Sequence, residues 1–166
     1  MKFELIDRII ELEPDTRIVA TKSVSLAEEY LADHFPTFPI LPGVLMLQAM
    51  VDAASWLTRV STHFAHSLIL LTEVRNVTYK SFVKPGQQMR LDVACRRLGE
   101  ADGEFAGTGH CGPVEVVKGR FVLRHFNLAD ENPALASLDR RVIQAARARY
   151  GLLCNHHDEA SADSAA

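Results

Sequence analysis

Apolar and polar residues alternate in the first part of the chain, which is the pattern of β-strands. Phe3, Leu5 and Ile9 are mixed with charged residues, and segment 16–24 (TRIVATKSV) is rich in β-branched residues. The sequence EPD between these two stretches is typical of a turn. The pattern therefore predicts two strands joined as a hairpin.

A short helical segment, a proline-rich loop and a long apolar helix are predicted next. In SLAEEYLADHF, Ser25 is a residue type favoured at helix N-termini, and acids lie near the start, as in a short helix or a helical turn. The prolines at positions 36, 39 and 42 then impose an extended loop. Pro42 suits the first turn of the following helix, because its missing N–H has no partner to lose there.

Three strand-like stretches follow the long helix. They span residues 68–83, 88–99 and 103–126, and the turn-forming sequences KPGQ and GEADG separate them. The last stretch is predicted as one long strand, bent or bulged at its glycines. One early helix among successive antiparallel strands indicates an α+β fold, in which a sheet wraps a single buried helix.

The composition changes near residue 132. Leu135, Leu138, Val142 and Ala145 recur at helical spacing, and four arginines lie toward the other side. This pattern predicts an accessory amphipathic helix within residues 129–154, with its apolar side packed on the domain. Residues 155–166 (NHHDEASADSAA) have neither core-forming residues nor periodicity, which predicts a disordered tail.

Composition and charge exclude several classes of function. The chain has 166 residues, 48% of them hydrophobic, and a net charge of −3. It is long enough for one sizeable core, and it lacks the strong positive charge that nucleic acid or an anionic membrane favours. No segment has the pattern of a signal peptide or a membrane span. The three cysteines lack metal-type spacing, so free thiols and a cytoplasmic location are expected.

Four polar residues form one narrow stripe on the long helix: Gln48, Asp52, Ser55 and Arg59. At about 100° per residue, they all lie on one side of the helix. A helix that is apolar nearly all round is buried nearly all round, so this stripe faces either a strip of solvent or a polar cavity. The stripe is too narrow for an ordinary surface helix. Its narrowness therefore favours a polar cleft beside the helix.

A histidine and two backbone amides are the second candidate group. The proline loop holds His34 close to the start of the helix, where the N–H groups of Gly43 and Val44 are free donors at the positive end. Such donors polarise a carbonyl oxygen and acidify the adjacent carbon, while a neutral imidazole takes its proton. The group therefore predicts chemistry next to the carbonyl of a thioester or an ester.

Residues 34–50, HFPTFPILPGVLMLQAM, resemble the signature HFPGxPxxPGVLxxEAMAQ of the 3-hydroxyacyl-acyl carrier protein dehydratases. Weaker similarity extends over roughly residues 3–125. This hotdog-fold family removes water from 3-hydroxyacyl thioesters in fatty-acid elongation. The resemblance implies a hotdog domain over residues 1–128, in which an antiparallel sheet wraps one long central helix. It also implies a lyase that makes trans-2-enoyl thioesters and needs neither a metal nor an organic cofactor.

The resemblance assigns roles to individual residues. His34 matches the catalytic base, and Gly43 matches the residue whose N–H holds the substrate carbonyl, with Pro42 and Val44 beside it in the substrate-binding segment. Thr37 lies where the family usually has glycine, so the loop after His34 is expected to differ.

The second catalytic residue of the family is a carboxylate of the central helix, and its position is occupied by Gln48. An amide can bind the departing hydroxyl but cannot protonate it. Asp52 lies one turn further on, where the family commonly has glutamine, so the acid and the amide are exchanged. Two interpretations follow: Asp52 is a relocated acid, or it only accepts hydrogen bonds from a buried donor at a dimer interface.

The resemblance also implies an assembly and a partner. Proteins of this family pair as dimers whose sheets join edge to edge, and some form trimers of dimers. The active site then lies between His34 of one subunit and the central helix of the other. The acyl thioester is carried by acyl carrier protein or coenzyme A. An acidic carrier would favour a basic patch, for which four arginines are candidates: Arg96, Arg97, Arg140 and Arg141.

Four functional hypotheses remain at this point. The first is the dehydratase, with His34, Gln48 and Asp52 as catalytic residues. The second is an acyl-thioester-binding protein without activity, or the inactive subunit of a hetero-oligomer, for which Gln48 is the direct argument. The third is a hotdog thioesterase in which Asp52 activates water. The fourth is an ordinary interaction domain without chemistry.

Overall fold

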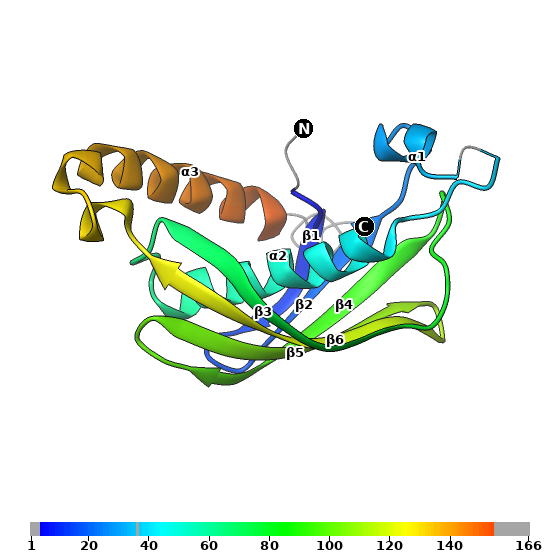
Figure 1. Cartoon of the computed structure of the whole chain (residues 1–166), viewed down its shortest axis with the longest axis horizontal. Helices are drawn as coiled ribbons and strands as arrows, with labels where there is room; N and C mark the ends of the chain where they lie inside the picture. Colours follow the sequence, from blue (N-terminus) through cyan, green and yellow to red (C-terminus); the bar gives the residue numbers. More distant parts are fainter. Residues whose placement is uncertain (1–3, 36, 155–166) are drawn as a thin grey trace, which may run out of the picture.

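A curved antiparallel sheet and one long helix form the body of the molecule (Figure 1). The computed structural model describes residues 4–35 and 37–154, so Phe3, Pro36 and the predicted tail at 155–166 lie outside the described residues. The described strands are β1 (Arg8–Glu13), β2 (Arg17–Ser23), β3 (Leu68–Tyr79), β4 (Gln88–Leu98), β5 (Asp102–Cys111) and β6 (Val114–Phe126). They lie in the order β1-β2-β4-β5-β6-β3.

The central helix is α2 (Gly43–Ser61), and it lies along the concave side of the sheet (Figure 1). Met46, Met50 and Leu57 of α2 are at most 2% exposed, and they belong to one core cluster with Leu91 of β4 and Phe121 of β6. The sheet therefore wraps a buried helix, and the predicted α+β architecture with one central helix is confirmed.

The hairpin predicted at the start of the chain is present, with β1 antiparallel to β2. The prediction of a single bent strand over residues 103–126 was wrong, because this segment forms the hairpin β5–β6. Gly112 lies in the turn with φ +55°, a left-handed conformation that glycine adopts without steric cost. Glycines in an alternating stretch mark a tight turn as readily as a bulge, so the sequence pattern did not separate the two.

A turn and a very short helix connect β2 to α2. The Ser25 hydroxyl accepts a hydrogen bond from the Ala27 N–H at 3.2 Å, but helix α1 (Tyr30–Asp33) begins only at Tyr30. The predicted segment therefore contains both a turn at Ser25 and a short helix that begins further on. Pro42 immediately precedes α2, and its carbonyl accepts the first hydrogen bonds of that helix.

The C-terminal helix α3 (Ala136–Cys154) follows the 3-10 turns η1 (Leu128–Asp130) and η2 (Pro133–Leu135), within the range predicted for an accessory helix. It packs on the domain, but the predicted apolar face was wrong. Ile143 and Tyr150 contact the core and Leu153 is buried, whereas Leu138 is 40% exposed.

A buried acid explains why α3 packs on the domain with a different side from the predicted one. Asp139 is only 5% exposed, and its carboxylate accepts hydrogen bonds from the Ser67 hydroxyl and from the N–H groups of Leu128 and Ala129. These bonds turn the Asp139 side of α3 toward the domain. The spacing of apolar residues did not reveal this side, because a carboxylate there looked like part of the polar face.

Among the described strands, β3 lies at one edge of the sheet, with β6 as its neighbour. It exposes apolar side chains, with Leu70 49%, Leu71 37% and Val74 43% accessible to solvent. An unpaired edge that carries apolar side chains is typical of a strand that is covered by a partner. No helix in the described part of the chain is long and apolar enough to cross a membrane.

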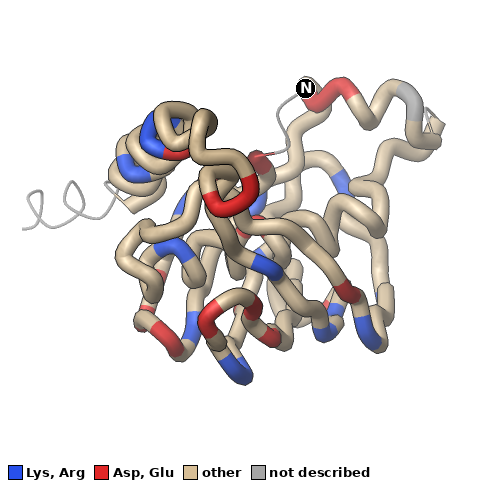
Figure 2. Tube along the Cα trace, turned by 60° about the vertical axis from the view of Figure 1, so that its left-hand side comes forward, with Lys and Arg blue, Asp and Glu red and all other residues tan. Residues whose placement is uncertain are grey.

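Charges of both signs are distributed over the sheet, and basic residues follow α3 (Figure 2). Of the four candidate arginines, Arg97 pairs with Asp102 at 2.7 Å and with Glu104 at 3.2 Å. Arg96, Arg140 and Arg141 are exposed. No single strongly basic face is visible in the view of Figure 2.

Candidate active site

His34 directly follows α1, which a shielded polar network holds in place. The backbone N–H of His34 donates to the Tyr30 carbonyl at 3.1 Å. The Tyr30 hydroxyl in turn donates to the Glu28 carboxylate, and Lys22 pairs with the same carboxylate at 2.8 Å. Lys22 is only 5% exposed, so this ion pair is largely screened from water. The backbone that carries His34 is therefore locally fixed.

The loop after His34 starts with an unusual backbone conformation. Phe35 has φ +52°, in the left-handed region that bulky residues rarely adopt. The Phe38 N–H then donates to the Phe35 carbonyl at 2.8 Å. This turn directs the chain toward the start of α2.

The N-terminus of α2 presents two free amides. Leu45 and Met46 donate to the Pro42 carbonyl at 2.9 and 3.2 Å, whereas the N–H groups of Gly43 and Val44 have no acceptor among the residues that the structure describes. The Tyr79 ring covers Gly43 so closely that a Cβ there would lie 3.2 Å from Tyr79 Cε1. Glycine at position 43 therefore allows the Tyr79 ring to pack directly against the helix N-terminus, whereas a larger residue would push the ring away.

His34 and Gly43 line the same cavity, which has a volume of about 320 Å³. The two residues come from different elements, and Tyr79 and Lys80 at the end of β3 close the cavity on another side. The structure thus brings the predicted base and a free amide donor to one hollow. We refer to it as the histidine cavity.

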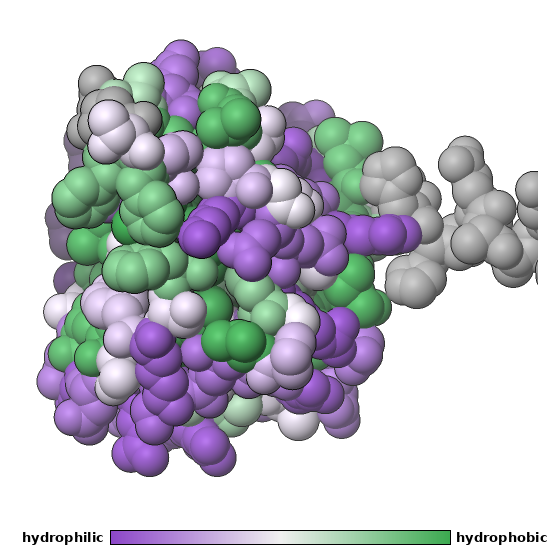
Figure 3. Space-filling model, turned by 90° about the vertical axis from the view of Figure 1, so that its right-hand side faces the viewer, coloured by the Kyte–Doolittle hydropathy of each residue, from purple (hydrophilic) through white to green (hydrophobic). Residues whose placement is uncertain are grey.

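Exposed apolar side chains surround the histidine cavity. Phe35 is 59% exposed, Phe82 60% and Val44 69%, and the Phe38 ring lies edge-on to Phe82 with centroids 6.1 Å apart. Figure 3 looks onto the side of the molecule that carries α1 and shows the apolar groups gathered there. Apolar surface of this kind is typical of a region that is covered by a ligand or by another protein.

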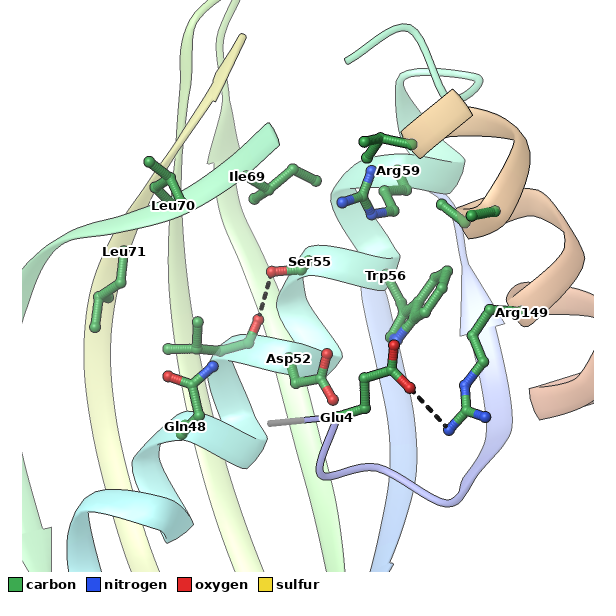
Figure 4. A pocket seen from close by; sticks show the side chains of 14 residues that line it. Glu4, Gln48, Asp52, Ser55, Trp56, Arg59, Ile69, Leu70, Leu71 and Arg149 are labelled. Atoms are coloured by element: carbon green, nitrogen blue, oxygen red, sulfur yellow. Dashed lines mark hydrogen bonds and ion pairs between the residues drawn. The ribbon is translucent and has the colours of Figure 1, made fainter. Parts of the chain in front are cut away.

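The polar stripe of α2 lines a second cavity, of about 500 Å³, which we refer to as the stripe cavity (Figure 4). Gln48, Asp52, Ser55 and Arg59 all contribute to it. Residues 69–71 of β3 form one wall and α3 forms the opposite wall. The cleft that the stripe predicts is therefore present in the structure.

Asp52 connects α2 to the N-terminal segment. Its Oδ2 accepts hydrogen bonds from the backbone N–H groups of Leu5 and Ile6, at 3.0 and 3.2 Å. Burial raises the pKa of the Asp52 carboxyl above its ordinary value, although the two amides act against that shift. Asp52 is thus an acceptor for buried donors, and at the same time a carboxyl that holds its proton to higher pH than usual.

Gln48 lies at the other end of the stripe cavity from Arg59 (Figure 4). Its side-chain amide makes no hydrogen bond to another residue in the described ranges, and it is partly exposed. The amide is therefore available to a bound molecule as both donor and acceptor.

Arg59 is the cation of the stripe. It lies in the last turn of α2 and donates to the His66 and Ser67 carbonyls at 3.2 and 3.3 Å. Burial lowers the pKa of its guanidinium, an effect that the charge of Asp52 opposes. Within residues 4–35 and 37–154, no carboxylate lies within 4 Å of its nitrogens.

The α3 wall of the stripe cavity was missed by the sequence analysis. Val142, Ala145, Ala146 and Arg149 line it, and Arg149 pairs with Glu4 at 3.6 Å. Val142 and Ala145 were assigned to the core-facing side of the helix. Their helical spacing was the available signal, but it did not distinguish packing on the core from lining a cavity.

The two groups of predicted residues lie in different cavities. His34 and Gly43 line the histidine cavity, whereas Gln48 and Asp52 line the stripe cavity further along α2. One copy of the chain therefore does not place the predicted base and the predicted acid in one hollow. Pro42 and Val44 flank Gly43 at the helix N-terminus.

Comparison with known proteins gives a family match. The model of the FabA-like domain matches residues 1–120. A 3-hydroxyacyl-[acyl-carrier-protein] dehydratase FabZ of Anoxybacillus flavithermus is 36% identical over 105 residues, 63% of this chain and 74% of the relative. The FabZ of Solibacter usitatus is 32% identical over 133 residues, 80% of this chain and 82% of the relative.

Solved structures share the fold at low sequence identity. One is the dehydratase heterocomplex ApeI:P from Xenorhabdus doucetiae, with a TM-score of 0.66 and 20% identity, covering 82% of this chain and 92% of that one. Another is smu.793 from Streptococcus mutans bound to acetyl CoA, with a TM-score of 0.54 and 18% identity, covering 71% and 86%. With the family match, these similarities identify the sheet and its central helix as a hotdog fold.

Proposed function

This chain belongs to the FabA-like domain family, and from that premise we propose that it is a 3-hydroxyacyl-thioester dehydratase. It eliminates water from the substrate and releases the trans-2-enoyl thioester. FabZ relatives at 32–40% identity over much of the chain support this activity. The observation that carries the proposal is the histidine cavity, where an imidazole and a free amide at a helix N-terminus face one hollow.

In this proposal, the proton at C2 of the substrate is removed in the histidine cavity, by His34 and with the help of Gly43. The Gly43 N–H donates to the thioester carbonyl oxygen and stabilises the negative charge that develops there, helped by the positive end of α2. The neutral imidazole of His34 takes the proton from C2. The C3–O bond then breaks, and the hydroxyl leaves as water once it receives a proton.

In this proposal Asp52 supplies that proton and Gln48 binds the departing hydroxyl. The raised pKa of Asp52 keeps more of the carboxyl protonated near neutral pH than an exposed aspartate would be. Because Oδ2 accepts both backbone amides, Oδ1 is the oxygen that we propose carries the proton. A water between the two side chains relays it to the hydroxyl held by Gln48.

The proposal requires a dimer. The exposed apolar side chains of edge strand β3 support pairing with β3 of a second copy, so that the two sheets join edge to edge. Such pairing allows the histidine cavity of one copy to meet the stripe cavity of the other. The apolar rim around His34 is the region where we place the arriving thioester, carried by acyl carrier protein or coenzyme A.

We further propose a division of labour along the chain. Residues 1–128 form the catalytic hotdog domain and residues 129–154 the accessory helix, which completes one wall of the stripe cavity. The location that we propose for the protein is the cytoplasm, a proposal that rests on its similarity to acyl-carrier-protein dehydratases.

A second candidate is an acyl-thioester-binding subunit without activity of its own. It is favoured by one observation: the family's carboxylate position holds Gln48, and Asp52 already satisfies two backbone amides. A dehydratase heterocomplex among the structural neighbours shows that dehydratases of this fold can occur as heterocomplexes.

Incubation of the purified protein with a 3-hydroxyacyl thioester separates these candidates. Absorbance of the enoyl thioester reports elimination, free thiol reports thioester hydrolysis, and size-exclusion chromatography reports the dimer. We expect enoyl product without free thiol. Release of thiol instead would identify a thioesterase, and absence of both, with activity appearing in Gln48→Glu, would identify the binding subunit.

A further inference from the structure

Arg59 does not fit a cavity built for a plain alkyl chain. Its guanidinium is partly buried in the wall of the stripe cavity, and burial lowers its pKa. Among the described residues, its hydrogen bonds are two long ones, both to neutral carbonyls. A methyl end placed against it would remove water from the cation without replacing the lost hydrogen bonds.

We infer that the Arg59 end of the stripe cavity binds an oxygen acceptor, above all a carboxylate, at the far end of the acyl chain of the substrate. This inference rests on the proposed function, since it takes the reacting carbons to lie beside Gln48 at the other end. It narrows the substrate class to 3-hydroxyacyl thioesters with a polar terminus.

The charges in the cavity leave Arg59 as the cation that is available to a ligand. Arg149, the other lining cation, pairs with Glu4 at 3.6 Å. Asp52 lies seven residues from Arg59 on the same stripe and is occupied by two backbone amides. Three of the five guanidinium N–H groups of Arg59 are not used in the two bonds to His66 and Ser67.

The length of the cavity suits an acyl chain. Gln48 and Arg59 are eleven positions apart, which corresponds to about 16 Å along the axis of α2. Ile69, Leu70 and Leu71 give the β3 wall of the cavity an apolar surface (Figure 4), and Val142 adds to it on the α3 wall. The polar side chains of Asp52 and Ser55 line the α2 side between Gln48 and Arg59. Apolar walls on β3 and α3, with a cation at the end of the cavity, suit the methylene groups of a medium-length chain that ends in a carboxylate.

Trp56 provides a direct measurement of binding. It is the only tryptophan of the chain, it lines the stripe cavity, and the Arg59 guanidinium carbon lies 6.0 Å from its ring centroid. We would titrate the protein with 3-hydroxydecanoyl-N-acetylcysteamine and with its ω-carboxy analogue, and follow Trp56 fluorescence together with enoyl formation. The ω-carboxy probe is expected to bind about 10- to 100-fold more tightly, the range of a charge-assisted hydrogen bond.

Two sets of variants test the role of Arg59. Arg59→Met should abolish the preference or reverse it toward the alkyl probe, and Arg59→Lys should retain part of it. Arg59 also holds the loop at His66, so its substitution could disturb the structure. A second pair of variants therefore leaves Arg59 unchanged. Ala145→Glu places a carboxylate on the exposed α3 wall of the cavity, and Ala145→Gln is its uncharged control. Ala145→Glu should lose the ω-carboxy preference and Ala145→Gln should keep it.

Three results would overturn the inference. Equal binding of the two probes by the wild type overturns it while leaving the dehydratase intact. A preference that persists unchanged in Arg59→Met and Ala145→Glu also overturns it. Binding of neither probe overturns both this inference and the proposed function. Preferential binding of the ω-carboxy probe without enoyl product supports the inference and argues for the binding subunit instead.

Discussion

The two ends of α2 differ in how their residues are used. At the N-terminal end, Gly43 and Val44 offer amides that have no acceptor among the described residues, and His34 lies against the same hollow. Along the rest of the helix, Asp52 and Arg59 are held by hydrogen bonds to the backbone.

This difference distinguishes polar groups that are available to a ligand from polar groups that stabilise the fold. Free donors at a helix N-terminus gain by binding an anionic or polarised oxygen, so the histidine cavity is suited to a ligand that carries such an oxygen. In the stripe cavity the same charged groups serve structure and remain partly available. Variants at the N-terminal end of α2 should therefore lower the activity without changing the stability. Variants in the stripe cavity should change both, and different substitutions of one residue should separate the two effects.

The largest expected effect is at His34. His34→Ala should lower kcat about 10³-fold, within the range for loss of a positioned base, and should leave the melting temperature close to that of the wild type. Enoyl absorbance and thermal unfolding measure the two effects. Retention of most of the activity would show that the chemistry does not depend on this end of α2.

Asp52 should show both effects, and two substitutions separate them. Asp52→Asn keeps an oxygen for the Leu5 and Ile6 amides but cannot donate a carboxyl proton, so kcat should fall about 10²-fold with little loss of stability. Asp52→Ala should add a loss of about 1–3 kcal/mol in the free energy of unfolding for each amide left unsatisfied. Wild-type kcat in Asp52→Asn would make Asp52 a purely structural acceptor.

Gly43, at the N-terminal end of α2, should show an effect on activity without a loss of stability, unlike Asp52. Gly43→Ala should lower kcat about tenfold, because the new Cβ would lie 3.2 Å from the Tyr79 ring and displace it or the amide. Stability should not fall, since alanine is favoured over glycine in helices by about 1 kcal/mol. Denaturant unfolding and enoyl kinetics test the pair of effects, and Tyr79→Ala in the same background should recover part of the activity if the clash is the cause.

The smallest expected effect is a pH dependence of stability that arises from Asp139, in the first turn of α3. Burial acts to raise the pKa of Asp139, but hydrogen bonds from Ser67 and from the Leu128 and Ala129 amides outweigh it and hold that pKa below its ordinary value. The stability that Asp139 provides is therefore complete above the ordinary aspartate pKa, and it is lost as the pH falls through the lowered value.

Trp56 fluorescence can follow this loss, because Tyr150 of α3 lies 6.2 Å from the Trp56 ring centroid. We expect an acid transition in the wild type that is weakened in Asp139→Asn, with α3 already less firmly packed at neutral pH. Arg140→Gln, on the exposed side of α3, should behave like the wild type. An identical acid transition in Asp139→Asn would exclude this carboxylate as its origin.

The sequence by itself determined the central helix, the hairpin at the start and the resemblance to a dehydratase family. These features depend on local patterns: apolar residues at helical spacing, β-branched alternation, and a compact signature from His34 to Met50. The polar stripe was also visible, because four residues on one side of an otherwise apolar helix can be read from spacing alone.

Only the tertiary structure decided how those residues are used. It placed His34 and Gln48 in different cavities, tied Asp52 to the amides of Leu5 and Ile6, and turned α3 so that Val142 faces a cavity. Each of these facts depends on contacts between segments far apart in the chain. Local patterns record which residues are apolar or charged, but the partner that a buried charge finds is set by the packing of the whole fold.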